Sequence, residues 1–370
     1  MKEEKNQQDE ELVDIDENGN PIEKEGDKKK KRLSYSYKYI LFIIIFLLLI
    51  VLCYYTLIKN KKGVFDETTL KNLKLKNRVF CGAITYDFQK IETLVQNDVA
   101  LVITGGAAVG DFAPTPLVKE EPFRIDSDEY IEDLKRLPEI VHKYNSYVLL
   151  DLVYMGLLGT KEPIYSPSGG KGFLLKDVES KAMTKEDILR IQNYFVQAAI
   201  RAKKAGFDGV EIHSGQLNLL SSFFSKIFNT RTDEYGGSDE NRARFVVEII
   251  KKIREAIGND MIISAKIDSV DEEKGYTESG FLTAGKCLEE AGVDLIEVTG
   301  PMPCKDGDIY FYNDTKKLAE TVKIPVTCIG GVRTYELADY VLKNSKIEYV
   351  ALSRTLMQEP DLIRKWHQNK

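Results

Sequence analysis

The sequence predicts a closed (β/α)8 barrel over residues 65–370, and three observations support this fold class. Eight short apolar runs alternate with longer helix-like stretches in this part of the chain. The runs are continuously apolar, as is typical of strands buried on both faces of a parallel sheet. Glycine and polar residues follow the seventh and eighth runs, where such barrels commonly bind phosphate. A doubly wound open sheet is the structural alternative.

The expected strands are residues 79–83, 100–105, 147–152, 209–213, 261–267, 294–300, 325–330 and 349–353. The expected helices include residues 88–97, 127–144, 184–205, 239–257, 277–291 and 334–342. Thr184 and Asp187 have the spacing of a capping box at a helix start. Gly206 and Gly292 follow two of the helices and fit their C-terminal ends.

Composition excludes several classes of protein. A chain of 370 residues can bury a large core, and its net charge of −6 argues against a nucleic-acid partner. The five cysteines contain no CxxC pair, so the sequence indicates neither a zinc site nor an iron–sulfur cluster, and no metal is expected. Cys81 and Cys328 lie in strand-like runs and are expected to be small core residues.

The residues before the barrel fall into three zones. Residues 1–38 are polar and charged, with too few apolar side chains to repay the entropy of ordering, so a disordered arm is expected. Residues 39–58 carry no charged side chain and have tyrosines near both ends, which predicts a single transmembrane helix in a lipid bilayer. Residues 59–64 would then link this helix to the barrel.

Two other interpretations of residues 39–58 are disfavoured. A buried helix of a globular protein would show a polar stripe, and a cleaved signal peptide would have a shorter leading segment and a small-residue cleavage site. Residues 24–38 hold seven Lys and Arg, against four in residues 59–73. This bias predicts a single-pass protein of the cell membrane with a cytoplasmic N-terminus and the barrel outside.

Candidate functional residues occur where the expected strands end, because barrel chemistry is located at the C-terminal ends of the strands. The fourth strand ends in His213, one of three histidines in the chain. The fifth contains Lys266, a cation in an apolar run that needs an anionic partner. The seventh ends in the pair Gly330 and Gly331, and the eighth in the pair Ser353 and Arg354.

The stretch GFDGVEIHSGQLNLLSSFFSKIFNTRTDEYGGSDENRARF at residues 206–245 resembles the Old Yellow Enzyme family of FMN-dependent ene-reductases. Residues 73–80, 101–109 and 324–362 extend the resemblance over almost all of the expected barrel. The resemblance implies a single-barrel protein that binds FMN non-covalently. It would pass hydride from NAD(P)H or another donor through the flavin to a small electron-poor acceptor, such as an activated alkene.

The resemblance also implies where the cofactor would bind. Lys266 matches an arginine at the N1–C2=O edge of the flavin, where a cation stabilises negative charge on the reduced ring. Asp151 stands where the family offers glutamine to the flavin pyrimidine, and a carboxylate there can accept the N3–H but would repel O2 and O4. The other implied cofactor residues are Gly82, Ala83, Ile84, Thr85 and Gly106 at the ring, and Gly330, Gly331, Ser353 and Arg354 at the phosphate.

The expected catalytic end departs from the family pattern. His213 and Gln216 stand where the family has a His and a His or Asn that hold the acceptor oxygen, and a glutamine N–H can still donate to that oxygen. Asn218 replaces the tyrosine that protonates the substrate, and an amide is no general acid. Tyr154 could substitute as the acid, although a packed tyrosine is the favoured interpretation. The charges of residues 231–244 are expected to pair locally and fix the loop, with Arg242 and Arg244 as anchors.

Two hypotheses follow. The first is an FMN-dependent NAD(P)H oxidoreductase of Old Yellow Enzyme type. The second is a membrane-tethered flavin- or ligand-binding protein with a degenerate catalytic site. Another type of FMN barrel, such as a dihydroorotate or hydroxyacid oxidiser, is disfavoured by the GGSDENRARF stretch. The oligomeric state is left open.

Overall fold

The computed structural model describes residues 15–22, 29, 37–52, 62–83, 87–110, 123–159, 163–171, 179–300 and 309–369. The chain divides into two compact units, Met1–Lys61 and Lys62–Lys370. In the first unit, Asp16 accepts backbone hydrogen bonds from Asn18 and Asn20, and Ile15 pairs with Pro21 in an antiparallel bridge. The rest of the expected disordered arm, apart from residues 29, 37 and 38, lies outside the described residues.

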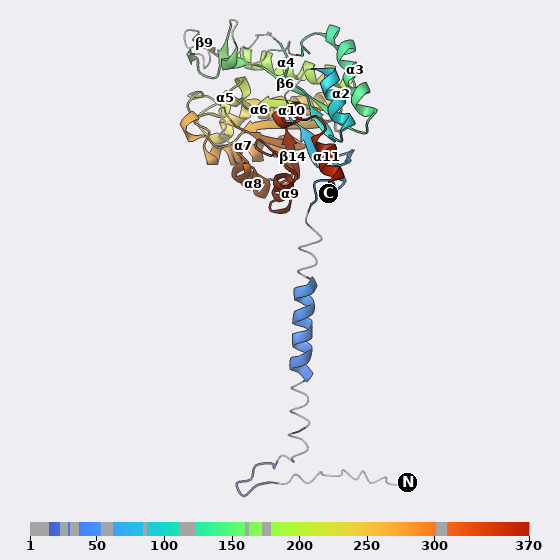
Figure 1. Cartoon of the computed structure of the whole chain (residues 1–370). Helices are drawn as coiled ribbons and strands as arrows, with labels where there is room; N and C mark the ends of the chain where they lie inside the picture. Colours follow the sequence, from blue (N-terminus) through green and yellow to red (C-terminus); the bar gives the residue numbers. More distant parts are fainter. Residues whose placement is uncertain are drawn as a thin grey trace, which may run out of the picture. The chain divides into compact units, whose positions relative to one another are not determined.

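Eight parallel strands form the centre of the second unit (Figure 1). They are β3 (Val79–Cys81), β4 (Leu101–Ile103), β6 (Tyr147–Val153), β10 (Gly209–Ser214), β11 (Ile262–Asp268), β12 (Leu295–Thr299), β13 (Val326–Ile329) and β14 (Tyr349–Leu352). Each strand pairs with its neighbours in chain order, β14 pairs with β3, and β6 pairs with β10. The sheet is therefore closed, which confirms the (β/α)8 barrel and excludes the open sheet.

Helices cover the outside of this barrel (Figure 1). They are α2 (Phe88–Gln96), α3 (Ile131–His142), α4 (Lys185–Lys204), α6 (Asp239–Ile257), α7 (Glu278–Ala291), α8 (Tyr312–Thr321), α9 (Tyr335–Lys343) and α11 (Leu362–Gln368). Two short helices, α5 (Leu219–Phe224) and α10 (Arg354–Gln358), follow β10 and β14. The short 3-10 helices are η1 (Asp128–Tyr130), η2 (Gly156–Leu158) and η3 (Glu272–Lys274).

The remaining strands are short. The antiparallel pair β1 (Thr68–Leu70) and β2 (Leu73–Leu75) precedes the barrel, and β5 (Ala107–Ala108) pairs with the end of β6. Three more strands, which lie between β6 and α4 along the chain, form a small separate sheet. They are β7 (Tyr165–Ser166), β8 (Gly170–Lys171) and β9 (Glu179–Ala182).

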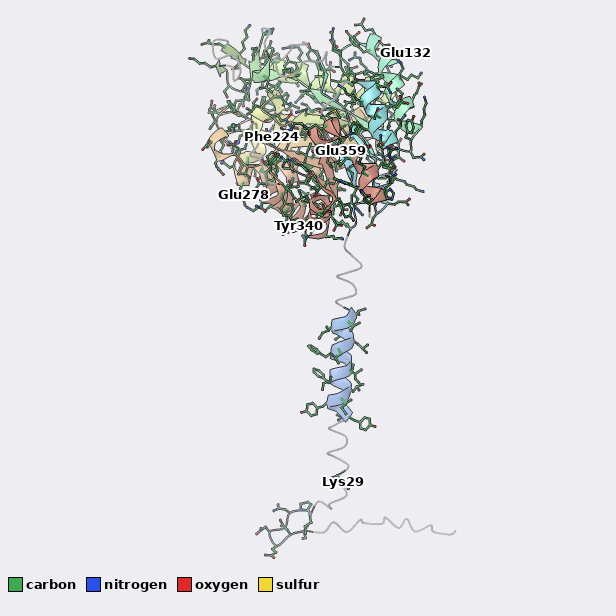
Figure 2. All side chains as sticks on the ribbon, in the orientation of Figure 1. Lys29, Glu132, Phe224, Glu278, Tyr340 and Glu359 are labelled. Carbon is green, nitrogen blue, oxygen red and sulfur yellow. The ribbon has the colours of Figure 1, made fainter. Side chains whose placement is uncertain are left out.

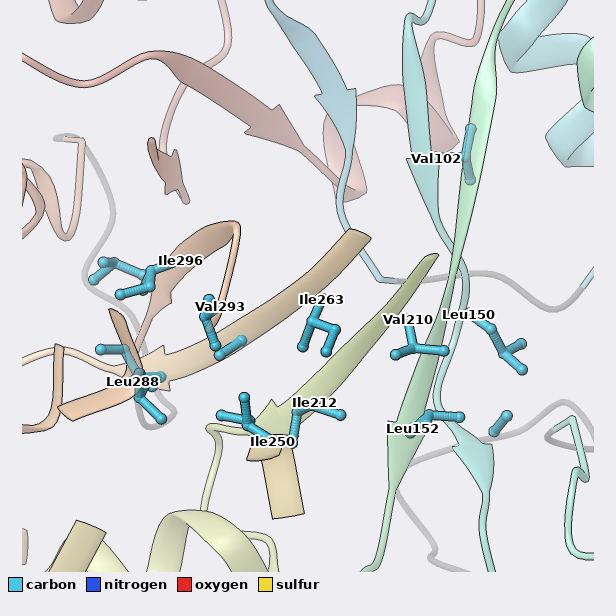
Figure 3. Packing of buried hydrophobic residues seen from close by; sticks show 14 of the residues in the cluster. Val102, Leu150, Leu152, Val210, Ile212, Ile250, Ile263, Leu288, Val293 and Ile296 are labelled. Atoms are coloured by element: carbon cyan, nitrogen blue, oxygen red, sulfur yellow. The ribbon is translucent and has the colours of Figure 1, made fainter. Parts of the chain in front are cut away.

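Two apolar clusters hold the barrel together. The larger one packs the outward faces of the strands against the helices, for example Ile212 and Ile250 in Figure 3. The smaller one joins Leu70 of the β1–β2 pair to inward-facing residues near the strand starts, including Phe80 and Tyr349. Burial of this apolar surface is the main favourable contribution to folding. Cys81 and Cys328 are fully buried core residues, as predicted.

Local signals in the sequence fix several helix ends as expected. Thr184 and Asp187 form the predicted capping box at the start of α4. Gly292 ends α7 with a left-handed φ of 99°, a conformation that glycine adopts without a Cβ penalty.

The packed unit begins slightly before the expected boundary at residue 65, because Val64 is fully buried in the larger cluster.

The predicted membrane span is wrong. The described part of this region is a helix at residues 37–52, with apolar side chains exposed along it (Figure 2). Within the described part of the chain, no helix is both long and apolar enough to cross a membrane. Residues 53–58 of the expected span lie outside the described residues. The predicted bilayer partner, cell-membrane location and extracytoplasmic barrel rested on this span and are corrected with it.

Candidate active site

An imidazole and a carboxylate meet at the C-terminal ends of two adjacent strands. His213 of β10 and Asp151 of β6 lie 2.6 Å apart between Nδ1 and Oδ2. Asp151 is fully buried, whereas 12% of the His213 side chain is exposed. Nδ1 of His213 faces this carboxylate, which leaves Nε2 for another partner. The other Asp151 oxygen, Oδ1, is buried without a hydrogen-bond partner among the described residues.

The loop after β10 has an unusual backbone that a buried carboxylate holds in place. Gln216 and Leu217 have left-handed φ values of 59° and 64°, which are uncommon for residues other than glycine. The Gln216 backbone N–H donates to Asp268 Oδ1 at 2.8 Å, and the Ser221 hydroxyl donates to Oδ2 at 2.5 Å. Burial raises the pKa of Asp268, and these hydrogen bonds oppose the rise. The Gln216 side chain is exposed.

Asn218 caps a helix and is not placed as a proton donor. It is the N-cap of α5, and its Oδ1 accepts the Ser221 N–H at 3.2 Å. The residue is almost fully buried, and its Nδ2 has no hydrogen-bond partner in the described structure. Tyr154 lies in the larger apolar cluster, which agrees with the favoured expectation of a packed tyrosine.

Lys266 lies between two buried carboxylates inside the barrel. Its Nζ is 2.8 Å from Glu297 Oε1 and 3.2 Å from Glu211 Oε1, and all three side chains are at most 3% exposed. Burial opposes the charge on Lys266, but Glu211, Glu297 and Asp151 outweigh it and raise the lysine pKa. Burial also raises the pKa of Glu211, although Lys266 counteracts this. The expected anionic partner is thus present, and there are two.

The first, seventh and eighth strands meet at another part of the rim. A Cβ on Gly82 would lie 2.4 Å from Ile329 Cδ1 and 2.7 Å from Ser353 Oγ, so a larger residue there would require both side chains to shift. Gly330 and Gly331 have φ values of 93° and 85°, which are left-handed conformations. Arg354 is exposed and has no charged partner among the described residues. At this part of the rim, Gly330 and Gly331 adopt backbone conformations that favour glycine, and Arg354 supplies an exposed positive charge.

The other expected site residues are placed as follows. Gly106 adjoins Asp151, since a Cβ there would lie 3.6 Å from Asp151 Oδ2 and 2.8 Å from Val153 Cγ1. Ala83 is partly buried against the smaller apolar cluster. Ile84 and Thr85, which were expected to line the flavin, lie outside the described residues.

The charges of residues 231–244 pair locally, as predicted. Arg231 binds Asp233 through Nε and Nη2 at 3.0 and 2.6 Å, and Arg242 pairs with Asp239. The Arg244 Nε donates to the Glu234 carbonyl at 2.7 Å. These contacts fix the loop.

The acids inside the barrel were not predicted from the sequence. Glu211 and Glu297 sit within apolar strand runs, as Lys266 does, and that pattern is the signal by which they could have been found. In the closed sheet, Lys266 is the register partner of both His213 and Glu297. Asp268 was overlooked because it falls just after the expected end of its strand at residue 267.

Fold and site together define a (β/α)8 barrel with an imidazole at its C-terminal rim. The family model described as NADH:flavin oxidoreductase / NADH oxidase matches residues 63–370. The NADPH dehydrogenase of Bacillus velezensis is 30% identical over 323 residues, covering 81% of this chain and 93% of the relative. The NADPH dehydrogenase of Bacillus subtilis is 28% identical over 319 residues, covering 81% and 93%.

Solved structures agree in fold. An Old Yellow Enzyme homologue from Zymomonas mobilis superimposes with a TM-score of 0.71 at 21% identity, covering 83% of this chain and 93% of that chain. Morphinone reductase superimposes with a TM-score of 0.72 at 24% identity, covering 84% and 90%. The chain therefore belongs to the NADH:flavin oxidoreductase family of Old Yellow Enzyme type. It is an FMN-dependent oxidoreductase that transfers hydride from NAD(P)H to an acceptor.

Proposed function

We propose that this protein reduces a small electron-poor acceptor, such as an activated alkene, whose oxygen binds at His213 and Gln216. The observation that carries the proposal is the dyad of His213 and Asp151 at the C-terminal rim, where barrel enzymes hold their reacting groups. NADPH is the proposed donor, because two relatives are named NADPH dehydrogenases. Residues 65–370 are proposed as the FMN-binding domain.

The residues at the rim fit FMN. The unpartnered buried oxygen of Asp151 is an acceptor for a ring N–H, and it is not needed by His213, which uses the other oxygen. Gly82 leaves room beside Ser353 that any side chain would fill. Gly330, Gly331, Ser353 and Arg354 are proposed to hold the phosphate, since backbone N–H groups and an exposed cation suit an anion. Ala83, Ile84, Thr85 and Gly106 are proposed to line the ring.

FMN supplies hydride transfer when it is bound. The protein's contribution is to orient the acceptor and polarise its oxygen, so that the electron-poor carbon is more easily reduced. His213 is held by Asp151 and points its second nitrogen away from that carboxylate. Gln216 is exposed on a fixed backbone, so its amide can donate to the same oxygen.

Lys266 is proposed to face the flavin pyrimidine and to offset negative charge there. The carboxylates of Glu297 and Glu211, at 2.8 and 3.2 Å from Nζ, already neutralise the charge of Lys266 in the protein without a ligand. We therefore expect a weaker stabilisation of anionic flavin than an unpaired arginine would give.

The test of this function uses the purified full-length chain, reconstituted with FMN. We expect a flavin absorption spectrum after removal of unbound FMN, bleaching by NADPH, and recovery of colour when cyclohex-2-enone is added. A chain that does not retain FMN would contradict the proposed binding site. Bound flavin that no enone reoxidises would instead favour the alternative of a ligand-binding protein with a degenerate site.

Asp268 gives a prediction about acceptor binding. Asp268→Asn should weaken binding of cyclohex-2-enone, with KM raised about tenfold or more, because hydrogen bonds to a charged group contribute about 1.5–3 kcal/mol each. The variant loses the carboxylate that holds the Gln216 N–H and the Ser221 hydroxyl. Steady-state kinetics with NADPH checks this, and Asp260→Asn, an exposed residue before β11, is the control. An unchanged KM would show that the Gln216 loop does not depend on Asp268.

A further inference from the structure

We propose that Tyr276 is a positioning residue for the acceptor and acts through a buried chain of hydrogen bonds. The chain runs from the Tyr276 hydroxyl through Ser221 and Asp268 to the backbone N–H of Gln216. It holds the backbone from which the Gln216 amide reaches the acceptor oxygen. The inference rests on the proposed function, in which that oxygen binds at His213 and Gln216.

The backbone at Gln216 and Leu217 has to be held by its surroundings. Both residues have left-handed φ values, 59° and 64°, a conformation that costs free energy for a residue with a Cβ and persists where neighbouring groups enforce it. The Gln216 side chain is exposed, so packing does not fix it. The place that its amide can reach therefore depends on the groups that keep this backbone in its conformation.

Hydrogen bonds between buried groups connect this backbone to Tyr276. Asp268 accepts the Gln216 N–H through Oδ1 at 2.8 Å and the Ser221 hydroxyl through Oδ2 at 2.5 Å. A serine hydroxyl has one hydrogen, which is used at Asp268, so the phenol donates the 2.7 Å hydrogen bond between Tyr276 and Ser221. Ser221, Asp268 and Tyr276 are at most 4% exposed, and hydrogen bonds in such surroundings are electrostatically stronger than in water.

The phenol of Tyr276 keeps its proton and stands on a fixed backbone. Burial and the nearby charge of Asp268 raise the pKa of Tyr276 well above its ordinary value of 10. The Tyr276 N–H donates to the Asp271 carbonyl at 2.9 Å, and the Asp271 N–H donates to the Tyr276 carbonyl at 2.8 Å. The hydroxyl is therefore a donor at a fixed point, from which it orients Ser221.

The aromatic ring of Tyr276 makes a second contribution, which can be separated from the first. With Leu217 and Leu158 it forms a third apolar cluster, which joins the loops that follow β6, β10 and β11. Tyr276→Phe keeps the ring in this cluster and removes only the hydroxyl. This variant therefore tests the hydrogen-bond chain by itself.

The kinetic test uses the FMN-loaded full chain, reduced with NADPH, or with dithionite if NADPH fails. The reduced protein is mixed with cyclohex-2-enone, and flavin reoxidation is followed by absorbance. Tyr276→Phe should lower the second-order rate constant about fivefold or more, the effect of losing one hydrogen bond of ordinary strength. Reoxidation by ferricyanide, which has no carbonyl oxygen to be placed, should be unchanged. Equal slowing with both acceptors would show a general structural defect and would overturn the proposal.

A double-mutant cycle tests whether Tyr276 acts through Gln216. Gln216→Ala should lower the rate constant with the enone about tenfold or more, because it loses the donor to the acceptor oxygen. Adding Tyr276→Phe to Gln216→Ala should then change the rate constant by less than about twofold, since the hydroxyl has no amide left to position. Two effects that multiply in the double variant would mean that Tyr276 acts elsewhere and would contradict the proposal.

A matched control and the single variants separate this proposal from the proposed function. Tyr235→Phe removes another buried phenol, whose oxygen donates to Glu248 Oε2 at 2.9 Å, and should leave both reoxidation rates unchanged. If Gln216→Ala is slow with the enone and Tyr276→Phe is not, only the role of Tyr276 is refuted. If Gln216→Ala is as fast as the unaltered protein, the proposed acceptor site is wrong and the role of Tyr276 is refuted with it.

Discussion

Replacing Lys266 by methionine is expected to destabilise the FMN-free protein by about 3–5 kcal/mol, the usual cost of breaking a buried ion pair by removing one partner. The variant leaves Glu211 and Glu297 buried without their cation. Urea unfolding followed by circular dichroism measures the effect. Lys286→Met, at an exposed position of α7, should stay within about 0.5 kcal/mol of the unaltered protein.

The destabilisation by Lys266→Met should depend on pH with a defined sign. The folded protein raises the pKa of Glu211 above its ordinary 4.5, so folding favours the protonated carboxyl. The stability that this group contributes is present below pH 4.5 and is lost as pH rises through its raised pKa. Without Lys266 the rise is larger, because the lysine lowers the pKa of Glu211. Through Glu211, the difference in stability between the variant and the unaltered protein should therefore be constant at acid pH and widen only as pH rises above the raised pKa of Glu211 in the unaltered protein, about 8.

Two further outcomes would bear on this explanation. Adding Glu211→Gln and Glu297→Gln to Lys266→Met should restore much of the stability, since neutral amides leave no unpaired charge. If Lys266→Met unfolded at the same urea concentration as the unaltered protein, the ion pairs would contribute nothing to stability. Lys266 would then be explained by its proposed role at the flavin and not by stability.

Replacing Arg231 by alanine is expected to cost about 3 kcal/mol, because hydrogen bonds of a charged group contribute about 1.5–3 kcal/mol each. The Arg231 Nη1 donates to the carbonyls of Pro167 and Met183 at 2.7 and 2.6 Å, and the rest of the guanidinium binds Asp233. The side chain is only 12% exposed. It therefore ties the loop after α5 to the segment before α4.

The loss of Arg231 can be distinguished from a general loss of charge. Arg231→Lys keeps the charge but lacks the planar fork, so it should recover only part of the stability. Lys185→Ala removes an exposed ion pair with Glu234 in the same region and should cost less than about 1 kcal/mol. Urea unfolding and the rate of limited proteolysis measure both variants. Equal stability of Arg231→Ala and Lys185→Ala would contradict the anchoring role.

Residue order singled out His213, Asp151 and Lys266, but it did not identify which side chains contact them. Lys266 within an apolar strand indicated an anionic partner, and the structure supplies Glu211 and Glu297. Asp151 was expected to face the flavin pyrimidine, where it could accept the N3–H and would repel O2 and O4. In the structure, one of its oxygens binds His213, a residue 62 positions away, and the other remains an unpartnered acceptor. The pairing depends on β6 and β10 being neighbours, which is a property of the closed sheet.

The prediction of a membrane span was wrong because it rested on composition alone. Residues 39–58 have the composition of a membrane span, but composition alone does not establish that a helix crosses a membrane. The described helix covers residues 37–52, and no described helix is long and apolar enough to cross a membrane. Hydropathy in a window therefore gave the right kind of element and the wrong conclusion.

The sequence by itself determined the eight strands, most of the helices between them and the capping at Thr184, because these depend on short-range periodicity and backbone propensity. It also determined the family, through residues 206–245. Only the tertiary structure decided which charges meet. Closure of the barrel sets the register between strands, and that register brings His213 to Asp151 and places Lys266 between two acids. Such contacts join residues far apart in the chain, so no local pattern encodes them.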